Sequence, residues 1–109
     1  MGVSKTNKFT EEQNRKANLY KALGHPARIA IVEFLIHHKT CVCGDIVDQL
    51  PLSQSTISQH LKELKNAGII KGDISGSTVC YCIDTSVWSE LEKMNDLFVS
   101  RYAKEIKCC

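Results

Sequence analysis

The six cysteines are the residues of this 109-residue chain best suited to chemistry, and they occur as three close pairs. These pairs are Cys41-Val42-Cys43, Cys80-Tyr81-Cys82 and Cys108-Cys109. Thiolates bind soft cations, and they are also the groups that oxidants attack. The polar N-terminal residues lack the apolar core of an export signal, so we expect free thiols rather than the disulfide framework of a secreted protein. The pairs therefore predict metal-binding or redox chemistry.

The composition is that of one soluble globular domain, with 43% hydrophobic and 24% charged residues. No apolar run approaches the roughly 18 residues needed to span a membrane, and we expect a cytoplasmic protein with no membrane partner. The net charge of +2 is too small to indicate a nucleic-acid-binding protein by itself. If DNA is the partner, basic residues must be concentrated locally or doubled by dimerisation.

The cysteine pairs are positioned by a predicted domain spanning residues 10–107, between a flexible arm at 1–9 and a cysteine tail at 108–109. Apolar periodicity and helix-end signals predict its elements, among them a capping-box pattern of Thr10 with Gln13 and an N-cap at Ser53. We expect helices near residues 10–23, 26–38, 42–50 and 54–66, strands at 69–75 and 77–83, and a final helix from about 85 to 102. The order α-α-α-α-β-β-α is that of a winged helix–turn–helix, mainly α with a β-hairpin wing.

The helix predicted near residues 54–66 has a polar face opposite its apolar stripe. Ile57, Leu61 and Leu64 form the stripe, and His60 at its edge is expected to pack rather than to bind a ligand. Glutamine can address adenine in a major groove, and lysines can contact phosphates, although a merely solvated face is the alternative. The residues predicted to contact operator double-stranded DNA are Gln54, Ser55, Thr56, Ser58, Gln59, Lys62, Lys65, Lys71 and Ser77.

The first and last helices lie outside the helix–turn–helix core, and their apolar stripes need a partner. Pairing of two protomers through these helices is the simplest solution. The residues predicted for this dimer interface are Leu19, Leu91, Met94, Phe98 and Tyr102.

Four segments together resemble the ArsR/SmtB family of metal-sensing repressors. They are Ala22–Ile29, Cys41–Ile46, Leu52–Leu61 and Ala67–Ile70. The resemblance covers about residues 15–100 and is carried by the combination of these motifs. It implies a homodimeric winged-helix repressor that binds operator DNA when metal-free and releases it when metal binds.

The resemblance also implies a metal site at Cys41 and Cys43, whose third thiol is missing from its usual place. In arsenic-sensing relatives a cysteine follows three residues after C-V-C, whereas this chain has Ile46 there. Cadmium- and lead-sensing relatives take thiols from an N-terminal segment, but no cysteine precedes Cys41, and the last helix lacks the histidines of zinc sensors.

We therefore predict that Cys108 or Cys109 completes the site. The expected inducer is trivalent arsenic or antimony, with cadmium, lead or zinc as alternatives, because all of these accept thiolates. The wing cysteines Cys80 and Cys82 are a second source of thiols. Their alternation places both on one face of a strand, where small packed side chains are the simpler interpretation.

The spacing of Cys41 and Cys43 suggests how a metal would act. Residues two apart on a regular helix point about 200° away from each other, so both can bind one ion only where the helix has not begun or unwinds. Metal would then favour a geometry with poor DNA affinity. A disulfide or persulfide between Cys41 or Cys43 and the tail is the alternative input. No acid–base partner or cofactor motif accompanies the cysteines, so we do not expect an enzyme.

Overall fold

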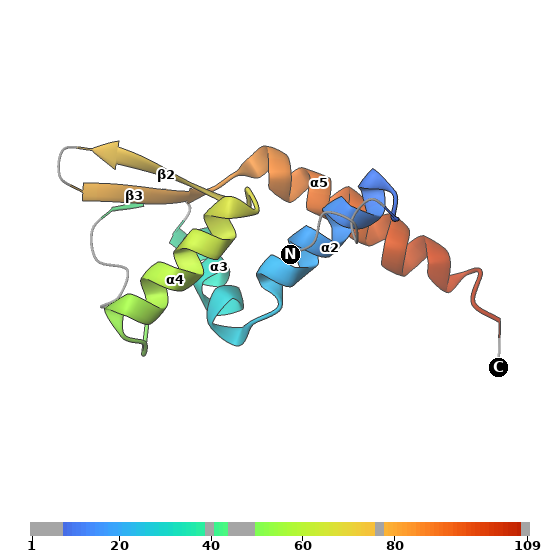
Figure 1. The fold of residues 1–109 in the computed structure, drawn as a ribbon, viewed down its shortest axis with the longest axis horizontal. Helices are drawn as coiled ribbons and strands as arrows, with labels where there is room; N and C mark the ends of the chain where they lie inside the picture. The colour runs from blue at the N-terminus through green and yellow to red at the C-terminus, as the bar shows by residue number, and fades with distance from the viewer. Residues whose placement is uncertain (1–7, 39–40, 44–49, 76–77, 108–109) are drawn as a thin grey trace.

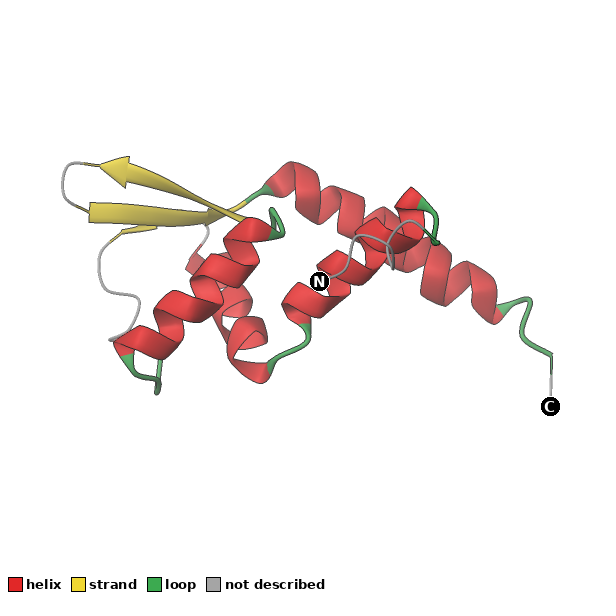
Figure 2. Ribbon diagram, viewed as in Figure 1, coloured by secondary structure: helices red, strands yellow, loops and turns green. Residues whose placement is uncertain are grey.

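The computed structural model describes residues 8–38, 41–43, 50–75 and 78–107. Helices dominate, and the strands gather at one end of the molecule (Figure 2). The elements are α2 (Glu11–Leu23), α3 (Pro26–His38), β1 (Val42–Cys43), α4 (Gln54–Asn66), β2 (Ile70–Ser75), β3 (Thr78–Ile83), α5 (Thr85–Asn95) and a π-helix, η2 (Asp96–Arg101). This mostly helical arrangement with an antiparallel hairpin after α4 confirms the predicted winged helix–turn–helix.

The core lies where α2, α3 and α4 meet the start of the hairpin. Its six largest fully buried side chains are Leu19, Ile31, Ile57, Leu64, Ile69 and Ile70. Burying each such side chain contributes about 1.5–3 kcal/mol. α3 buries Ala27, Ile31, Val32 and Leu35, which lie on one face of the helix, whereas Ile29 and Ile36 are exposed although the sequence of α3 is apolar nearly throughout. The core therefore fixes α4 against α3 on one side and against β2 on the other.

Side chains at the helix starts supply the expected caps. Thr10 accepts a hydrogen bond from the Gln13 N–H at 3.0 Å, and the Gln13 side chain accepts one from the Thr10 N–H at 3.0 Å, which completes the predicted capping box. Ser53 caps α4, as predicted. After α4 the chain turns through Gly68, whose φ of +84° lies in the left-handed region that favours glycine. The turn places β2 directly after α4.

The sheet has three strands in the order β1-β3-β2, whereas a two-stranded hairpin was predicted. Val42 pairs with Tyr81 and Cys43 with Cys80, both antiparallel. The prediction of a helix starting at Val42 is therefore wrong at its first two residues, and positions 44–49 lie outside the described residues. The physical reason is that β1 satisfies backbone groups along the otherwise unpaired edge of β3.

The apolar spacing predicted one regular helix at the end of the chain. The structure instead has an α-helix followed by a π-helix. α5 ends at Asn95, and in η2 the Tyr102 N–H bonds to the Leu97 carbonyl five residues earlier. In this wider turn the Phe98 ring lies 6.0 Å from the Tyr20 ring and 4.3 Å from the Lys16 ammonium. α5 and η2 together extend away from the hairpin end, past α2, towards the C-terminus (Figure 1). Among the described residues, no helix has the length and apolar character to cross a membrane.

Candidate nucleic-acid interface and thiol site

α4 has one buried face and one exposed polar face. Its buried residues are Ile57, His60, Leu61 and Leu64. Most of the residues predicted to contact DNA are exposed, namely Gln54, Ser55, Ser58, Gln59, Lys62 and Lys65, together with Lys71 on β2. Thr56 is half-buried, and Ser77 lies outside the described residues. The structure therefore gathers the predicted α4 residues on one accessible surface.

The N-terminal end of α4 suits contact with an anionic backbone. The Thr56 N–H donates to Ser53 Oγ at 3.4 Å, and the Ser53 hydroxyl donates to Thr56 Oγ1 at 2.9 Å. No acidic side chain lies in the first turn. The positive end of the helix dipole is therefore not neutralised by the chain's own first-turn carboxylates, and it can attract a phosphate.

A polar cluster beneath this surface anchors α4 to α3. Arg28 donates from Nε to His60 Nδ1 at 3.1 Å, and the rings of His25 and His60 lie 4.4 Å apart. His25 Nδ1 in turn accepts the Ala27 N–H at 3.0 Å, at the start of α3. Because His60 accepts at Nδ1, the ring is neutral and its proton is on Nε2. Burial, with an exposed fraction of 8%, is the largest cause that lowers the pKa of His60, followed by the nearby His25 and Arg28.

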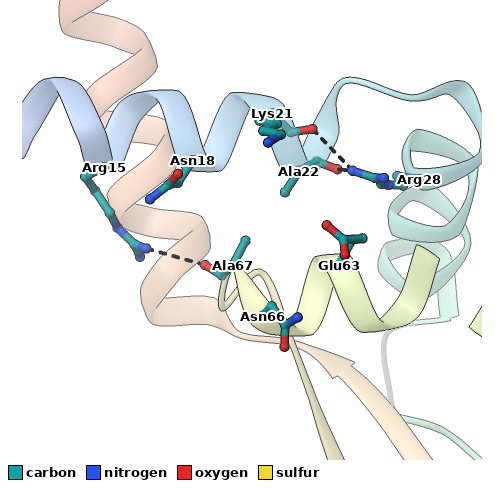
Figure 3. Close-up of a pocket in the computed structure, with 8 residues that line it drawn as sticks. All are labelled: Arg15, Asn18, Lys21, Ala22, Arg28, Glu63, Asn66 and Ala67. Atoms are coloured by element: carbon teal, nitrogen blue, oxygen red, sulfur yellow. Dashed lines mark hydrogen bonds between the residues drawn. The ribbon is translucent and has the colours of Figure 1, made fainter. Parts of the chain in front are cut away.

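Arg28 also connects this cluster to the end of α2. Its Nη1 donates to the carbonyls of Lys21 at 3.3 Å and Ala22 at 3.4 Å (Figure 3). These contacts border a pocket of about 300 Å³ between α2 and the second half of α4. The pocket is lined by Arg15, Asn18, Lys21, Ala22, Arg28, Glu63, Asn66 and Ala67. The guanidinium thus satisfies carbonyls at a helix end and fixes the orientation of α4.

A second arginine connects the first and last helices. Arg15 forms a bidentate pair with Glu90, through Nε at 2.8 Å and Nη2 at 3.0 Å, and Nη1 reaches the Ala67 carbonyl at 3.4 Å. This hydrogen-bonded pairing raises the pKa of Arg15 and lowers that of Glu90. Both side chains are about two-fifths exposed, at 39% and 45%, so solvent screens the pair.

The cysteines of the C-x-C motif and the wing come together across β1 and β3. A disulfide joins Cys41 to Cys82, with their Cα atoms 4.5 Å apart. Cys43 stands opposite Cys80 in the backbone register, and Cys80 is buried and also disulfide-bonded. The expectation of free thiols is therefore wrong for Cys41, Cys80 and Cys82. Antiparallel pairing is the physical reason, because it places opposite residues on the same face of a sheet.

The remaining predicted ligands are not tested by this structure. Cys108 and Cys109 lie outside the described residues, so the set Cys41, Cys43, Cys108 and Cys109 stays a prediction. Within the described ranges, no three or more His, Cys, Asp or Glu side chains are arranged to hold a metal. His37, near the C-x-C motif, donates from Nδ1 to the Glu33 carbonyl at 2.7 Å within its own helix.

A pocket of about 340 Å³ opens beside the Cys41–Cys82 pair. Its lining residues come from α3, β3, α5 and the chain next to them. They are Leu35, Ile36, Cys41, Cys82, Ile83, Thr85 and Trp88. Cys41 is exposed and Cys82 is half-buried, so both sulfur atoms lie at the boundary between solvent and an apolar wall. Sequence reasoning missed this arrangement because it placed the first C-x-C at the start of a helix; the available signal was that residues 41–43 and 80–82 share the same C-x-C spacing.

The residues predicted for the dimer interface fall into two groups. Leu19 and Leu91 pack within the chain's own core, at 0% and 7% exposed, and Met94 is half-buried. Phe98 and Tyr102 are exposed, at 44% and 41%. Only the second group offers substantial apolar surface to another protomer.

Comparison with known proteins identifies similar sequences and folds. Residues 25–71 match the family described as "Bacterial regulatory protein, arsR family". An uncharacterized HTH-type transcriptional regulator of Methanocaldococcus jannaschii is 38% identical over 87 residues, which cover 79% of this chain and 97% of the relative. The HTH-type transcriptional repressor SmtB of Mycobacterium tuberculosis is 48% identical over 63 residues, covering 58% of this chain and 46% of that protein.

A further relative and a solved structure agree with these matches. The Staphylococcus aureus protein named as a homolog of the cadmium resistance transcriptional regulatory protein CadC is 35% identical over 85 residues, 75% of this chain and 69% of the relative. An ArsR-like transcriptional regulator from Rhodococcus sp. RHA1 has the same fold, with a TM-score of 0.73 at 16% identity over 88% of this chain and 90% of that chain.

Proposed function

Because the chain belongs to the ArsR/SmtB family of transcriptional regulators, we propose that it is a homodimeric repressor whose operator is released when a soft metal binds cysteine thiolates. The members of this family are regulators and not enzymes, in agreement with the sequence-based expectation. We propose operator double-stranded DNA, contacted through α4, as the partner, and the cytoplasm as the site of action.

One observation carries the proposal, namely the connection of Cys41 to the wing. Cys41 is bonded to Cys82 on β3, and β3 pairs with β2, which packs against α4. A change of bonding at Cys41 therefore acts on the sheet that flanks the DNA-reading helix. A ligand that binds one arrangement better than the other shifts the population between them, and DNA affinity follows.

For the metal, we propose trivalent arsenic or antimony held by Cys41 and Cys43, with Cys108 or Cys109 as the third thiolate. Thiolates are the preferred ligands of soft cations. Cadmium, lead and zinc are the alternatives, and the resemblance to a protein named for cadmium resistance supports cadmium among them.

We propose that the dimer forms through η2 and the adjoining helix surface. Phe98, Val99 and Tyr102 are exposed on this segment, which projects beyond the core (Figure 1). Exposed apolar side chains gathered on one projecting helix are typical of an interface between protomers. Light scattering of the wild type should give twice the monomer mass, and Phe98→Ser should shift the protein towards monomer, whereas a monomeric wild type would contradict the proposal.

A thiol redox input is the second candidate, and the Cys41–Cys82 disulfide favours it. A hydroperoxide would oxidise one thiol to a sulfenic acid with release of water or alcohol. The second thiol would then displace water to form the disulfide. A persulfide, or a disulfide between Cys41 or Cys43 and the tail, belongs to the same class of input.

Titration of a protein–DNA complex separates these candidates. The reduced protein first selects a duplex from a random-sequence pool, and the complex is then titrated with arsenite, antimonite, cadmium or hydrogen peroxide. We expect arsenite or antimonite to release the DNA while peroxide is absent. Release that needs peroxide and ignores every metal would replace the metal input by the redox input. Failure to select any duplex would overturn both.

A further inference from the structure

We infer that Cys41 and Cys82, once reduced, form a two-thiol site for a trivalent arsenical that carries one organic group, with that group seated in the adjoining apolar pocket. The inference deepens the proposed function, on which its regulatory consequence rests. It differs from the predicted metal site in taking its second sulfur from the wing rather than from the C-x-C partner or the tail.

The first requirement of such a site is that its two sulfur atoms lie close together, and Cys41 and Cys82 meet it. The Cα atoms of Cys41 and Cys82 lie 4.5 Å apart, although 41 residues separate them in sequence. β1, which begins at Val42 directly after Cys41, is paired with β3, the strand that carries Cys82. Reduction of the disulfide leaves two thiols in reach of one atom, and the exposed position of Cys41 gives a ligand access.

The number of thiols selects the class of ligand. Trivalent arsenic forms three bonds, and the described residues hold no three-residue cluster for inorganic arsenite. An arsenical R–As(OH)₂ needs only two sulfurs, because carbon already occupies the third bond. Two S–H bonds and two As–OH bonds break, two As–S bonds form, and two molecules of water leave. No electrons are transferred, so no oxidant or reductant is consumed.

The pocket has the volume and the uncharged lining that the organic group needs. Its volume of about 340 Å³ lies at the lower end of the roughly 300–1,000 Å³ typical of small-molecule pockets. Ile36 from α3, Ile83 from β3 and Trp88 from α5 line it, and none of its described lining residues is charged. Burial of an uncharged aryl or alkyl group against these side chains is favourable, and an aromatic substituent can stack on the indole.

The fluorescence of Trp88 reports on this pocket because it is the only tryptophan of the chain. The probe is phenylarsine oxide, which hydrates to the dihydroxy form. It is added to full-length protein reduced with a phosphine, which carries no competing thiol. We expect the Trp88 emission to change and to saturate in the wild type, and Cys82→Ser and Cys41→Ser to lose this response. The oxidised protein should not respond, because its disulfide has no S–H to condense.

Cys80→Ser is the matched cysteine control, since Cys80 lies two residues away on the same strand. It should keep the Trp88 response, and so should a Cys108→Ser/Cys109→Ser variant. Each of these two variants removes thiols that can bind the probe outside the proposed site. A response retained by Cys82→Ser would overturn the inference. Loss of the response in Cys80→Ser, with a native circular dichroism spectrum, would also overturn it by showing that a larger cluster is required.

A matched pair on α3 tests the apolar pocket. Ile36 lines the pocket and Ile29 does not, yet both side chains are 41% exposed. We expect Ile36→Ser to weaken phenylarsine oxide binding about tenfold, the scale of losing one or two buried methylene groups, and Ile29→Ser to leave it unchanged. Equal effects of the two substitutions would overturn the seating of the organic group in this pocket.

The fluorescence measurement contains no DNA, so the two proposals can fail separately. A Trp88 response with the expected variants, in a protein that selects no duplex, would leave this site standing and overturn the proposed repressor function. DNA release by arsenite, without any Trp88 response to phenylarsine oxide, would support the repressor and overturn this site.

Discussion

The α3–α4 region and the β1–β3 region hold the winged helix–turn–helix together by different chemistry. α4 is fixed by fully buried Ile57 and Leu64 and by the Arg28–His60 hydrogen bond at 3.1 Å. β1 is a strand of two residues that meets β3 beside the Cys41–Cys82 bond. Apolar packing and the Arg28–His60 hydrogen bond contain no sulfur and do not respond to a thiol reagent, whereas the Cys41–Cys82 bond does. The difference separates the α4 surface, which we propose contacts DNA, from a sheet edge that we propose a thiol ligand alters.

The largest expected effect is a loss of stability when a substitution creates a cavity beneath α4. Leu64 is completely buried, and Leu64→Ala should lower the free energy of unfolding by about 2–5 kcal/mol. Urea denaturation of the reduced protein measures this change. Lys65→Ala, on the exposed face of the same helix, is the control and should be nearly neutral. Similar losses in the two variants would contradict the assigned core.

Removal of the arginine anchor should be the next largest effect. Arg28→Ala removes the donor to His60 Nδ1 and to the Ala22 carbonyl, while the Lys21 carbonyl keeps its bond from the Gly24 N–H. We expect a loss of about 1.5–3 kcal/mol in unfolding free energy. Arg15→Ala is the control, because its exposed pair with Glu90 should contribute less than about 1 kcal/mol. A larger loss in Arg15→Ala would place the main anchor between α2 and α5 instead.

A substitution on the exposed face should affect DNA binding without affecting folding. Gln59→Ala should weaken binding to the selected duplex by about 1–3 kcal/mol, the range for one good base contact, and leave the unfolding free energy unchanged. Fluorescence anisotropy with labelled duplex measures the affinity. Asn66→Ala, exposed at the other end of α4, is the comparison and should have the smaller effect. No change in Gln59→Ala would remove this residue from the interface.

The smallest expected effect is a pH dependence that comes from the α3–α4 region. Burial lowers the pKa of His60, so the unfolded chain binds a proton at this position more readily than the folded chain does. Stability should therefore be complete above the unfolded pKa of about 6.5 and fall as the pH drops through that value towards the lowered folded pKa. Denaturation at about pH 7.5 and about pH 5.5 tests this, with His60→Gln expected to reduce the dependence. An unchanged dependence in that variant would assign it to another group.

Sequence patterns predicted the parts of the molecule that are encoded locally. The Thr10 capping box, the Ser53 cap and the apolar stripe through Ile57, Leu61 and Leu64 depend on residues three or four positions apart, and they occur as expected. The order of helices and hairpin also follows from these signals, because each element carries its own periodicity and ends.

The thiol region could not be predicted in the same way. Two residues such as Val42 and Cys43 carry no strand periodicity, and they form a strand only because β3 offers an unpaired edge. The Cys41–Cys82 contact spans 41 positions, so no local spacing identifies it. Likewise, the widened turn of η2 accompanies contacts of Phe98 with Tyr20 and Lys16 on α2, which lie far away in sequence.

Operator affinity with and without arsenite, measured for the reduced wild type and for Cys41→Ser, is the most direct test of thiol control over α4. We expect arsenite to release the wild type from the selected duplex and to leave Cys41→Ser bound, with similar affinities before arsenite is added. Equal release of both proteins, or release of neither, would contradict the proposal that Cys41 links a soft-metal input to DNA binding.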